Sequence, residues 1–186
     1  AIYQIIDEAL FCHVAHNMKG QPLVTPTAHW RDGDWFYWHG LNSARNVADT
    51  PSHPVCINVT HFDGLVLARS AFHHSINYRS VTVFGTPEPV EDEAEKTRQL
   101  EIFMEKIMPG RWSTLRPING KELKATGIVR IPITEASAKV RAAPPVDDPE
   151  DYTWPVWAGV LPLLRTWGEP EPDPDRQVDA ELHWPN

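Results

Sequence analysis

The sequence predicts a mainly β fold with peripheral helices around one hydrophobic core. Its densest strand signal lies between residues 55 and 90, where the runs VCINVTH, GLVLARSAF and YRSVTVFG are rich in β-branched and apolar residues. The tripeptide Phe62-Asp63-Gly64 between the first two runs is typical of a hairpin turn, so we expect these strands to be antiparallel neighbours. A chain of 186 residues, 41% of them hydrophobic, is long enough to form one domain.

The first ten residues predict a short amphipathic helix. In AIYQIIDEAL the apolar side chains recur three and four positions apart, which places them on one face of a helix. This apolar stripe consists of Ile2, Ile5, Ile6, Ala9 and Leu10.

Three strands joined by tight turns are expected next, over residues 11–17, 22–30 and 35–40. The turns between them are MKGQ and RDGD. Pro26 lies inside the second strand and cannot donate a hydrogen bond to a neighbouring strand. We therefore expect that strand to lie at an edge of the sheet, or to contain a bulge, at Pro26.

Residues 40–49 predict a short helix that could hold a phosphate. Asn42 or Ser43 can cap this helix, and Arg45 then lies in its first turn. Free N–H groups at a helix N-terminus attract phosphate, and an arginine adds two parallel donors. An ordinary surface connection between two strands is the alternative interpretation of the same residues.

The clearest helix is expected over residues 91–108. Acidic residues fill its first turn, an apolar stripe follows, and Pro109-Gly110 end it. A further strand is expected over residues 127–133, followed by the segment 135–141.

The composition changes to proline and acidic residues after Ala142. Residues 152–164 interrupt this pattern with two tryptophans and several aliphatic side chains, which indicates a segment that packs on the protein. We expect one domain over residues 1–167 and a loose acidic tail over residues 168–186.

The distribution of charge argues against a nucleic-acid partner. Residues 1–145 carry 15 basic and 15 acidic side chains, whereas the whole net charge of −8 falls in residues 146–186. A neutral body with an acidic tail repels a phosphate backbone. With no run of 18 apolar residues, no evident signal peptide and two cysteines that read as free thiols, we expect a cytoplasmic protein without a membrane span.

The run DGLVLARSAFHHSINYRSVTVFG, residues 63–85, resembles the signature of flavin-nucleotide-binding proteins related to pyridoxamine 5'-phosphate oxidase. The resemblance extends from about Ile5 to Pro162. It implies a six-stranded antiparallel split β-barrel of the FMN-binding type, with FMN as the expected cofactor and FAD as the alternative.

The resemblance also implies a cofactor site. In the family, a His-Gly pair at a strand end precedes the residues that hold the flavin phosphate, and Ala44 here replaces the usual Ser or Arg, so one phosphate contact should be missing. Arg45 and Arg79 can supply charge for the phosphate, small hydroxyl groups can reach the ribityl chain, and Trp157 can cover the ring. The predicted cofactor-binding residues are Thr25, Thr27, His39, Gly40, Ser43, Arg45, Tyr78, Arg79, Ser80 and Trp157.

The C-terminal residues that bind substrate in the family differ in this chain. Pyridoxamine phosphate oxidases follow their C-terminal Trp-Gly with an Arg-x-His pair that binds substrate, whereas this chain has VLPLL at residues 160–164. Because no cation is available there for a pyridoxal phosphate, we do not expect vitamin B6 oxidation.

The leading functional hypothesis is an FMN-dependent oxidoreductase acting on a small soluble substrate. Hydride chemistry resides on the flavin, so no protein nucleophile is required and no catalytic residue is predicted. Some split-barrel relatives bind haem, which gives an alternative with His61, His73 or His74 as axial ligand. A non-catalytic flavin-binding or sensing module is a third reading. The absence of H-x-x-x-H and C-x-x-C patterns predicts no metal site.

An excess of apolar side chains predicts a homodimer with the flavin at its interface, as the resemblance also implies. The chain has more tryptophan side chains than one small hydrophobic core can bury. Those assigned to the excess are Trp30, Trp35, Trp38, Trp154 and Trp157.

Overall fold

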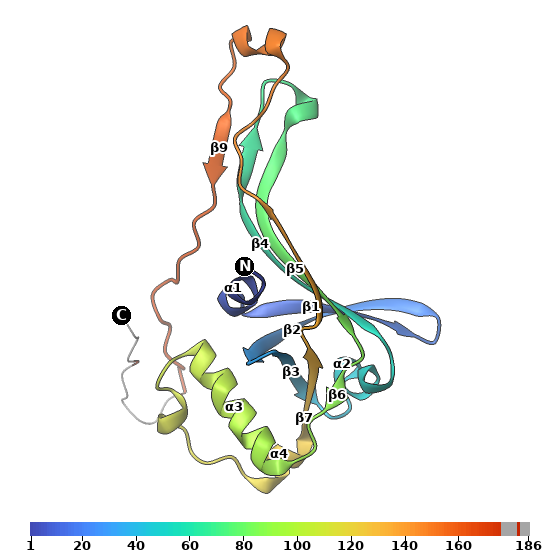
Figure 1. The fold of residues 1–186 in the computed structure, drawn as a ribbon. Helices are drawn as coiled ribbons and strands as arrows, with labels where there is room; N and C mark the ends of the chain where they lie inside the picture. The colour runs from blue at the N-terminus through green and yellow to red at the C-terminus, as the bar shows by residue number, and fades with distance from the viewer. Residues whose placement is uncertain (176–181, 183–186) are drawn as a thin grey trace.

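The computed structural model describes residues 1–175 and residue 182, and its architecture is a curled antiparallel sheet with helices around it (Figure 1). Eight strands follow one another in the order β6-β7-β3-β2-β1-β4-β5-β8, and β9 pairs with β4. The strands are β1 Phe11–Met18, β2 Gln21–Asp32, β3 Trp35–Leu41, β4 Val55–Leu67, β5 Ser75–Gly85, β6 Glu88–Pro89, β7 Thr126–Pro132, β8 Glu135–Arg141 and β9 Gly159–Pro162. The α-helices are α1 Ile2–Glu8, α2 Arg45–Ala48, α3 Glu93–Ile107 and α4 Gly120–Ala125. The predicted mainly β barrel with peripheral helices is confirmed, although the described residues form nine strands where six were expected.

Pro26 lies at an unpaired edge of β2, as expected. β2 pairs with β1 through residue 28 and with β3 from residue 29 onwards. His29 donates its backbone N–H to the Leu10 oxygen at 3.3 Å, so the alternation along the strand turns the nitrogen of Pro26 away from β1. No described strand pairs with that side of β2 at Pro26, and its missing N–H group therefore interrupts no ladder.

The sheet is covered on both faces, which produces two core clusters. Phe36 and Trp38 of β3 belong to the cluster inside the barrel. Trp30 and Tyr37 point the other way and pack under α3 against Phe103. Because β3 is buried on both faces, its sequence is continuously apolar instead of alternating. Trp30 and Trp38 are fully buried, so the structure removes them from the predicted excess of exposed tryptophans.

The hairpin expected at Phe62-Asp63-Gly64 is wrong, because β4 runs straight through it. Phe62 pairs with Tyr78 and Gly64 pairs with the next residue on β5, Asn77, which leaves Asp63 as an extra residue. This is a β-bulge inside one long strand. Residues typical of turns also occur at bulges, so the sequence correctly indicated an irregularity here but wrongly suggested a hairpin.

The expected cap of the short helix after β3 is also wrong. Ala44 is the N-cap of α2, and no side chain caps the helix. Asn42 instead donates its side-chain amide to the carbonyl of Lys124 in α4, and its backbone N–H to Ala125 at 2.9 Å. Contacts with α4 therefore fix this loop, and local capping does not.

β4 and β5 continue beyond the barrel as a long ribbon, which together with residues 142–162 forms a protruding arm (Figure 1). The buried carboxylate of Asp147 accepts bonds from the backbone and the guanidinium of Arg69, at 2.8 and 2.9 Å, and ties the two sides of the arm together. β9 pairs with residues 64–67 of β4, so residues 159–162 of the segment 152–164 pack on the chain as expected, whereas most of its other side chains are exposed. Trp154 and Trp157 nevertheless remain 65% and 64% exposed. The domain boundary at residue 167 stays a prediction, and most of the tail expected to be loose lies outside the described residues.

Candidate functional site

Six of the predicted cofactor-binding residues gather where β2 and β3 meet α2. The hydroxyl of Thr27 donates to the carbonyl oxygen of His39 at 3.4 Å, which joins the two strands at this point. Thr25 lies two residues before Thr27 and therefore on the same face of β2. The group consists of Thr25, Thr27, His39, Gly40, Ser43 and Arg45.

A pair of glycines allows α2 to lie directly on the sheet. Gly40 of β3 and Gly127 of β7 are opposite each other in the ladder. A Cβ atom on Gly127 would lie 2.4 Å from a methyl group of Val47, and one on Gly40 would lie 3.2 Å from the other methyl group. The indole of Trp38 also donates to the carbonyl of Asn46 at 2.7 Å. These contacts fix the position of α2 and so of the backbone that carries Arg45.

Arg45 has the unpaired charge that a phosphate requires. Its side chain is exposed and makes no ion pair or hydrogen bond within the described ranges 1–175 and 182. α2 has four residues, too few for a strong dipole. Phosphate binding at this end would therefore depend on the Arg45 guanidinium and on the exposed hydroxyl of Ser43 beside it.

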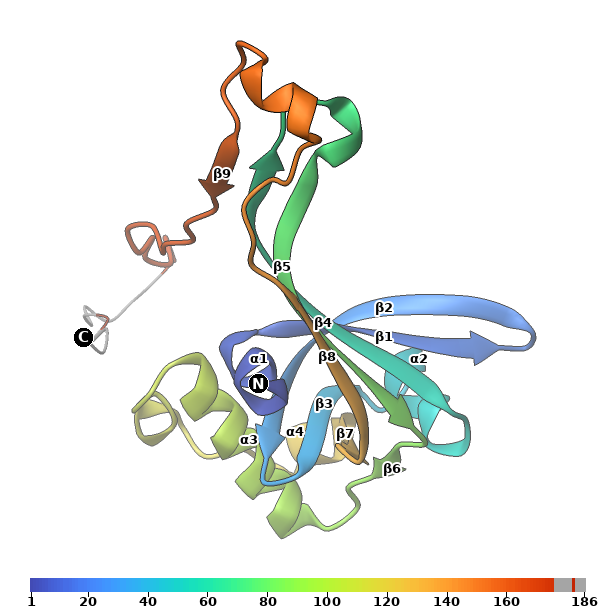
Figure 2. The same cartoon turned by 45° about the horizontal axis from the view of Figure 1, so that its top comes forward.

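Arg79 lies elsewhere and is already paired. Its Nε and Nη2 donate to the two oxygens of Asp63 at 2.9 and 3.0 Å, and its Nη1 donates to Glu8 of α1. These bonds raise the pKa of Arg79 and lower the pKa values of Asp63 and Glu8. Figure 2 shows α1 and α2 on either side of the crossing strands. Within one chain, Arg79 and Arg45 therefore do not form a common phosphate socket.

The remaining predicted residues form separate groups. Tyr78 and Ser80 flank Arg79 on β5 and face the opposite side of the sheet, where Lys139 lies 5.8 Å from the centre of the Tyr78 ring. Trp157 lies in the arm, just before β9 (Figure 1). One chain alone thus does not bring all ten predicted residues to one place.

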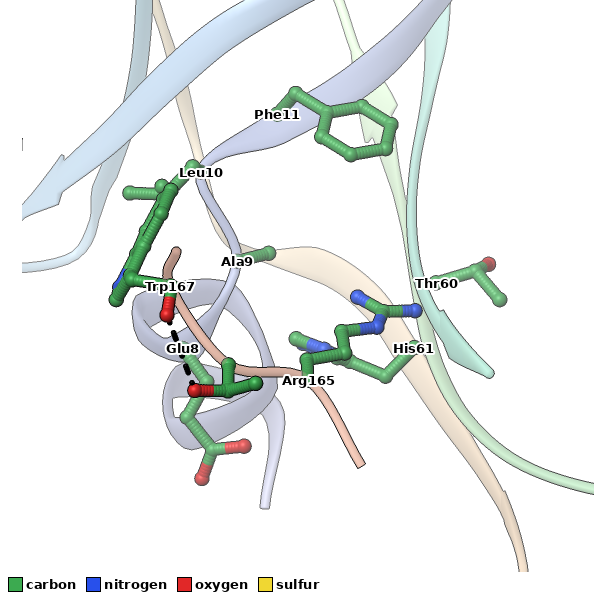
Figure 3. A pocket seen from close by; sticks show the side chains of 9 residues that line it. Glu8, Ala9, Leu10, Phe11, Thr60, His61, Arg165 and Trp167 are labelled. Atoms are coloured by element: carbon green, nitrogen blue, oxygen red, sulfur yellow. Dashed lines mark hydrogen bonds between the residues drawn. The ribbon is translucent and has the colours of Figure 1, made fainter. Parts of the chain in front are cut away.

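A cavity of about 430 Å³ lies between the barrel and the C-terminal segment 165–167 (Figure 3). Its walls are mostly apolar, with one histidine and one arginine among them. Such a lining, apolar with few polar groups, is typical of a site for a flat organic cofactor. The lining residues are Glu8, Ala9, Leu10, Phe11, Thr60, His61, Arg165, Thr166 and Trp167.

The histidine of this cavity is held by the end of α1. The last carbonyl groups of a helix have no partner inside it. His61 Nε2 donates to the carbonyl of Ile5 at 2.9 Å, and His29 Nε2 donates to that of Ile6 at 2.9 Å. Burial lowers the pKa of His29 to about 3, so its ring is neutral at pH 7. His29 is a structural cap, whereas His61 also lines the cavity.

A second cavity, of about 410 Å³, lies beside His39 between β3, α3 and α4. Burial lowers the pKa of His39, and its Nδ1 atom is buried without a hydrogen-bond partner in the part of the chain that the structure describes. The arginine of this cavity, Arg116, is paired with Glu122. This cavity therefore offers a neutral imidazole and no unpaired guanidinium among its lining residues.

Sequence reasoning missed Phe11, Arg165 and Trp167. They lie far from the signature in the sequence, and the fold alone brings the C-terminal segment against β1. One signal was available, since an arginine and a tryptophan stand out in a segment of proline and acidic residues.

Two further classes of site were searched for over the described residues. No three His, Cys, Asp or Glu side chains lie close enough together to hold a metal ion. No helix within residues 1–175 combines the length and the apolar character needed to cross a membrane.

Comparison with known proteins identifies a family and two similar structures. The family model described as pyridoxamine 5'-phosphate oxidase matches residues 1–140. The flavocytochrome Anf3 from Azotobacter vinelandii is 43% identical with a TM-score of 0.92, over 97% of this chain and 85% of that one. An FAD- and haem-binding protein from Mycobacterium smegmatis is 33% identical with a TM-score of 0.91, over 96% of this chain and 88% of that one.

A candidate 5-nitroimidazole antibiotic resistance protein from Bacteroides thetaiotaomicron shares the fold, at 20% identity and a TM-score of 0.60, over 74% of this chain and 80% of that one. No match is found among curated proteins.

Proposed function

Because the chain belongs to the pyridoxamine 5'-phosphate oxidase family, we propose that it is an oxidoreductase that binds a flavin nucleotide and a haem. A flavin supplies hydride or electron transfer, and a haem supplies one-electron and O₂ chemistry. The observation that carries the proposal is the similarity to a flavocytochrome and to an FAD- and haem-binding protein over nearly the whole chain. This similarity covers 97% and 96% of the chain and so continues past residue 140, where the family model ends.

The residues present fit a flavin nucleotide. Arg45 is an exposed, unpaired guanidinium beside the Ser43 hydroxyl, and Thr25 and Thr27 offer hydroxyl groups on the adjoining strand. Arg79 is a weaker candidate for the phosphate because two carboxylates already offset its charge. We propose Arg45 as the principal phosphate contact and FAD as the flavin, with FMN, expected from the sequence, as the competing species.

Some of the residues present also suit a haem. A haem requires an apolar pocket with a neutral imidazole, and charged groups at the edge for its two carboxylates. The cavity of Figure 3 offers apolar walls and the Arg165 guanidinium, and the Nε2 atom of its histidine, His61, already donates to the Ile5 carbonyl. His73 and His74, the other axial ligands considered from the sequence, likewise each use one ring nitrogen, toward Asp148 and toward the carbonyl of Ser70.

We also propose a homodimer, in which the arm of one chain completes the site of the other. The arm exposes several large apolar side chains, including Phe72, Trp154 and Trp157. Trp157 lies apart from Arg45 within one chain, so its predicted role against the flavin ring requires a second chain. Sedimentation analysis of the flavin-loaded protein should give the mass of two chains, and a monomer that retains flavin would contradict this arrangement. The cytoplasmic location stays a prediction.

Reconstitution distinguishes the parts of the proposed function. The purified protein should bind FAD or FMN more tightly than riboflavin, because riboflavin lacks the phosphate, and it should develop a Soret band with haemin. It should then oxidise NADH or NADPH with an added acceptor faster than free flavin does. Binding without turnover would instead favour the non-catalytic module, and binding of neither cofactor would refute the proposal.

A further inference from the structure

The side chain of His39 points away from the group that we assign to the flavin. Trp30 lies three residues after Thr27 on β2, so these two side chains are on opposite faces of the sheet. The His39 ring is on the face of Trp30, with its centroid 5.8 Å from that of the Trp30 ring and 4.7 Å from that of Phe103 in α3. The backbone of His39 therefore belongs to the flavin group, whereas its ring is available to a different ligand.

The cavity of about 410 Å³ beside His39 has a volume typical of a small-molecule site, for which the usual range is about 300–1,000 Å³. Its walls come from β3, α3, α4, the segment that joins these two helices, and the start of β7. We propose that this cavity binds an uncharged, flat aromatic compound whose carbonyl oxygen accepts a hydrogen bond from His39 Nε2. The proposal goes beyond the proposed function and does not depend on flavin or haem binding.

His39 presents one ring nitrogen to the cavity. Its side chain is partly exposed and its Nδ1 atom is buried without a partner in residues 1–175, which leaves Nε2 as the nitrogen that a ligand can reach. Burial lowers the pKa of His39, so its ring is neutral at pH 7 and carries one proton. On Nδ1 this proton would be a buried donor without an acceptor, which folded proteins rarely contain, so we assign it to Nε2. His39 thus offers one N–H donor to the compound in the cavity.

The charged groups at the rim of the cavity neutralise each other. Arg116 Nη1 donates to one carboxylate oxygen of Glu122 at 3.0 Å, and Arg116 Nη2 donates to the other. Glu122 also accepts the backbone N–H of Asn119 at 3.1 Å, at the start of α4. Because both charged groups already have partners, the cavity offers no counter-charge to an ion and suits an uncharged compound.

The walls favour an aromatic compound over an aliphatic one. Trp112 lines the cavity, is partly exposed, and makes no ring contact with another described residue. Met104 and Leu100 of α3 lie in the same wall. A flat ring stacks on an indole and contacts a methionine sulfur favourably. The carboxylate of Glu105 accepts the backbone N–H groups of Gly110 and Trp112 at 2.6 and 3.0 Å, which fixes the segment that carries the indole.

Three probes of similar shape test the proposal by equilibrium dialysis against the purified full chain. Acetonaphthone is an uncharged aromatic ketone, naphthalene lacks the acceptor oxygen, and naphthoate carries a negative charge. Wild type should bind acetonaphthone, and it should bind naphthoate more weakly because Arg116 is already paired. Tighter binding of naphthoate than of acetonaphthone, or no binding of acetonaphthone, would overturn the proposal.

Variants of His39 and Trp112 separate the hydrogen bond from the stacking contact. His39→Phe keeps a ring against Trp30 and Phe103 and removes the donor, so its affinity for acetonaphthone relative to naphthalene should fall by about two- to tenfold. Trp112→Leu should weaken both probes by about three- to tenfold. His53→Phe is the matched control and should change neither affinity, because His53 is exposed and does not line the cavity. An unchanged ratio of the two affinities in His39→Phe would contradict the assigned donor.

Nitrogen NMR of the histidine side chains gives a test in the wild-type protein that does not depend on the folding of His39→Phe. The His39 signals, identified by their loss in His39→Gln, should show the proton on Nε2 at pH 7 and should shift when acetonaphthone is added. The His53 signals should not shift. A proton on Nδ1 of His39, or His39 signals that acetonaphthone leaves unchanged, would overturn the proposal.

Discussion

Alanine substitutions of Arg45 and Arg79 should affect different properties, although the sequence assigned both arginines to one phosphate. Arg45→Ala should weaken flavin binding, and Arg79→Ala should lower the stability of the fold. Arg45 is exposed and unpaired, so Arg45→Ala removes a charge-assisted contact from the bound phosphate. Such a contact contributes about 1.5–3 kcal/mol, which corresponds to roughly ten- to a hundredfold in affinity for FAD or FMN. The stability of the free protein should change by less than about 0.5 kcal/mol, as at other exposed positions.

Arg79→Ala should instead destabilise the protein and leave flavin affinity nearly unchanged. Arg79 holds Asp63 through two bonds and Glu8 through a third. The three side chains are 31%, 33% and 40% exposed, so solvent screens these bonds below the values of a buried pair. We expect a loss of about 1–2 kcal/mol in the free energy of unfolding.

The loss should depend on pH in a defined direction. Arg79 lowers the pKa values of Asp63 and Glu8, so the stability that they contribute is present above the ordinary carboxylate pKa. That stability disappears as the pH falls through the lowered pKa values. The difference between wild type and Arg79→Ala should therefore shrink in acid.

Urea unfolding followed by tryptophan fluorescence, together with titration of FAD, FMN and riboflavin, measures both effects. Riboflavin should bind wild type and Arg45→Ala equally, since it has no phosphate. If Arg79→Ala weakens FAD tenfold at an unchanged urea midpoint while Arg45→Ala binds normally, the assignment of the two arginines is reversed.

Three other substitutions test the packing around the site. Gly127→Ala should lower the free energy of unfolding by about 1–3 kcal/mol, because its Cβ atom would lie 2.4 Å from Val47. Gly120→Ala is the control and should not destabilise the protein, because the space around Gly120 is open. Equal urea midpoints for the two variants would contradict the close packing of α2 on the sheet. His16→Phe should stabilise by about 1 kcal/mol because both ring nitrogens of His16 are buried without partners in the described residues; a loss of stability would reveal a partner from a second chain or a cofactor. Lowering the pH from about 6.5 to about 3 should destabilise wild type more than His29→Gln, because burial lowers the pKa of His29 to about 3; parallel acid profiles would contradict this.

Local patterns predicted the elements whose causes are local. The helix over the first ten residues, the β1–β3 strands, the edge position of Pro26 and the long helix α3 all follow from periodicity, turn residues and end signals. The bulge at Asp63 could not be separated from a hairpin, because that distinction depends on which strand lies alongside. The cap of α2 was missed for a similar reason, since Asn42 is engaged by α4.

The site was harder to predict because its parts come from distant segments. The resemblance predicted a group that ends in Arg45 and comes from one continuous stretch of chain. It could not show that Arg79 is paired with Glu8, 71 positions away, or that Arg165 reaches the cavity of His61. Burial of Trp30 and Trp38 depends likewise on α3 and the barrel core, which the composition alone does not reveal.

The absorption spectrum of the purified full chain, followed by extraction and quantification of its cofactors, tests the central claim most directly. The account predicts flavin bands and a Soret band in one preparation, with close to one flavin and one haem released per chain. Protein that carries neither band, and acquires neither after incubation with FAD, FMN and haemin, would contradict it.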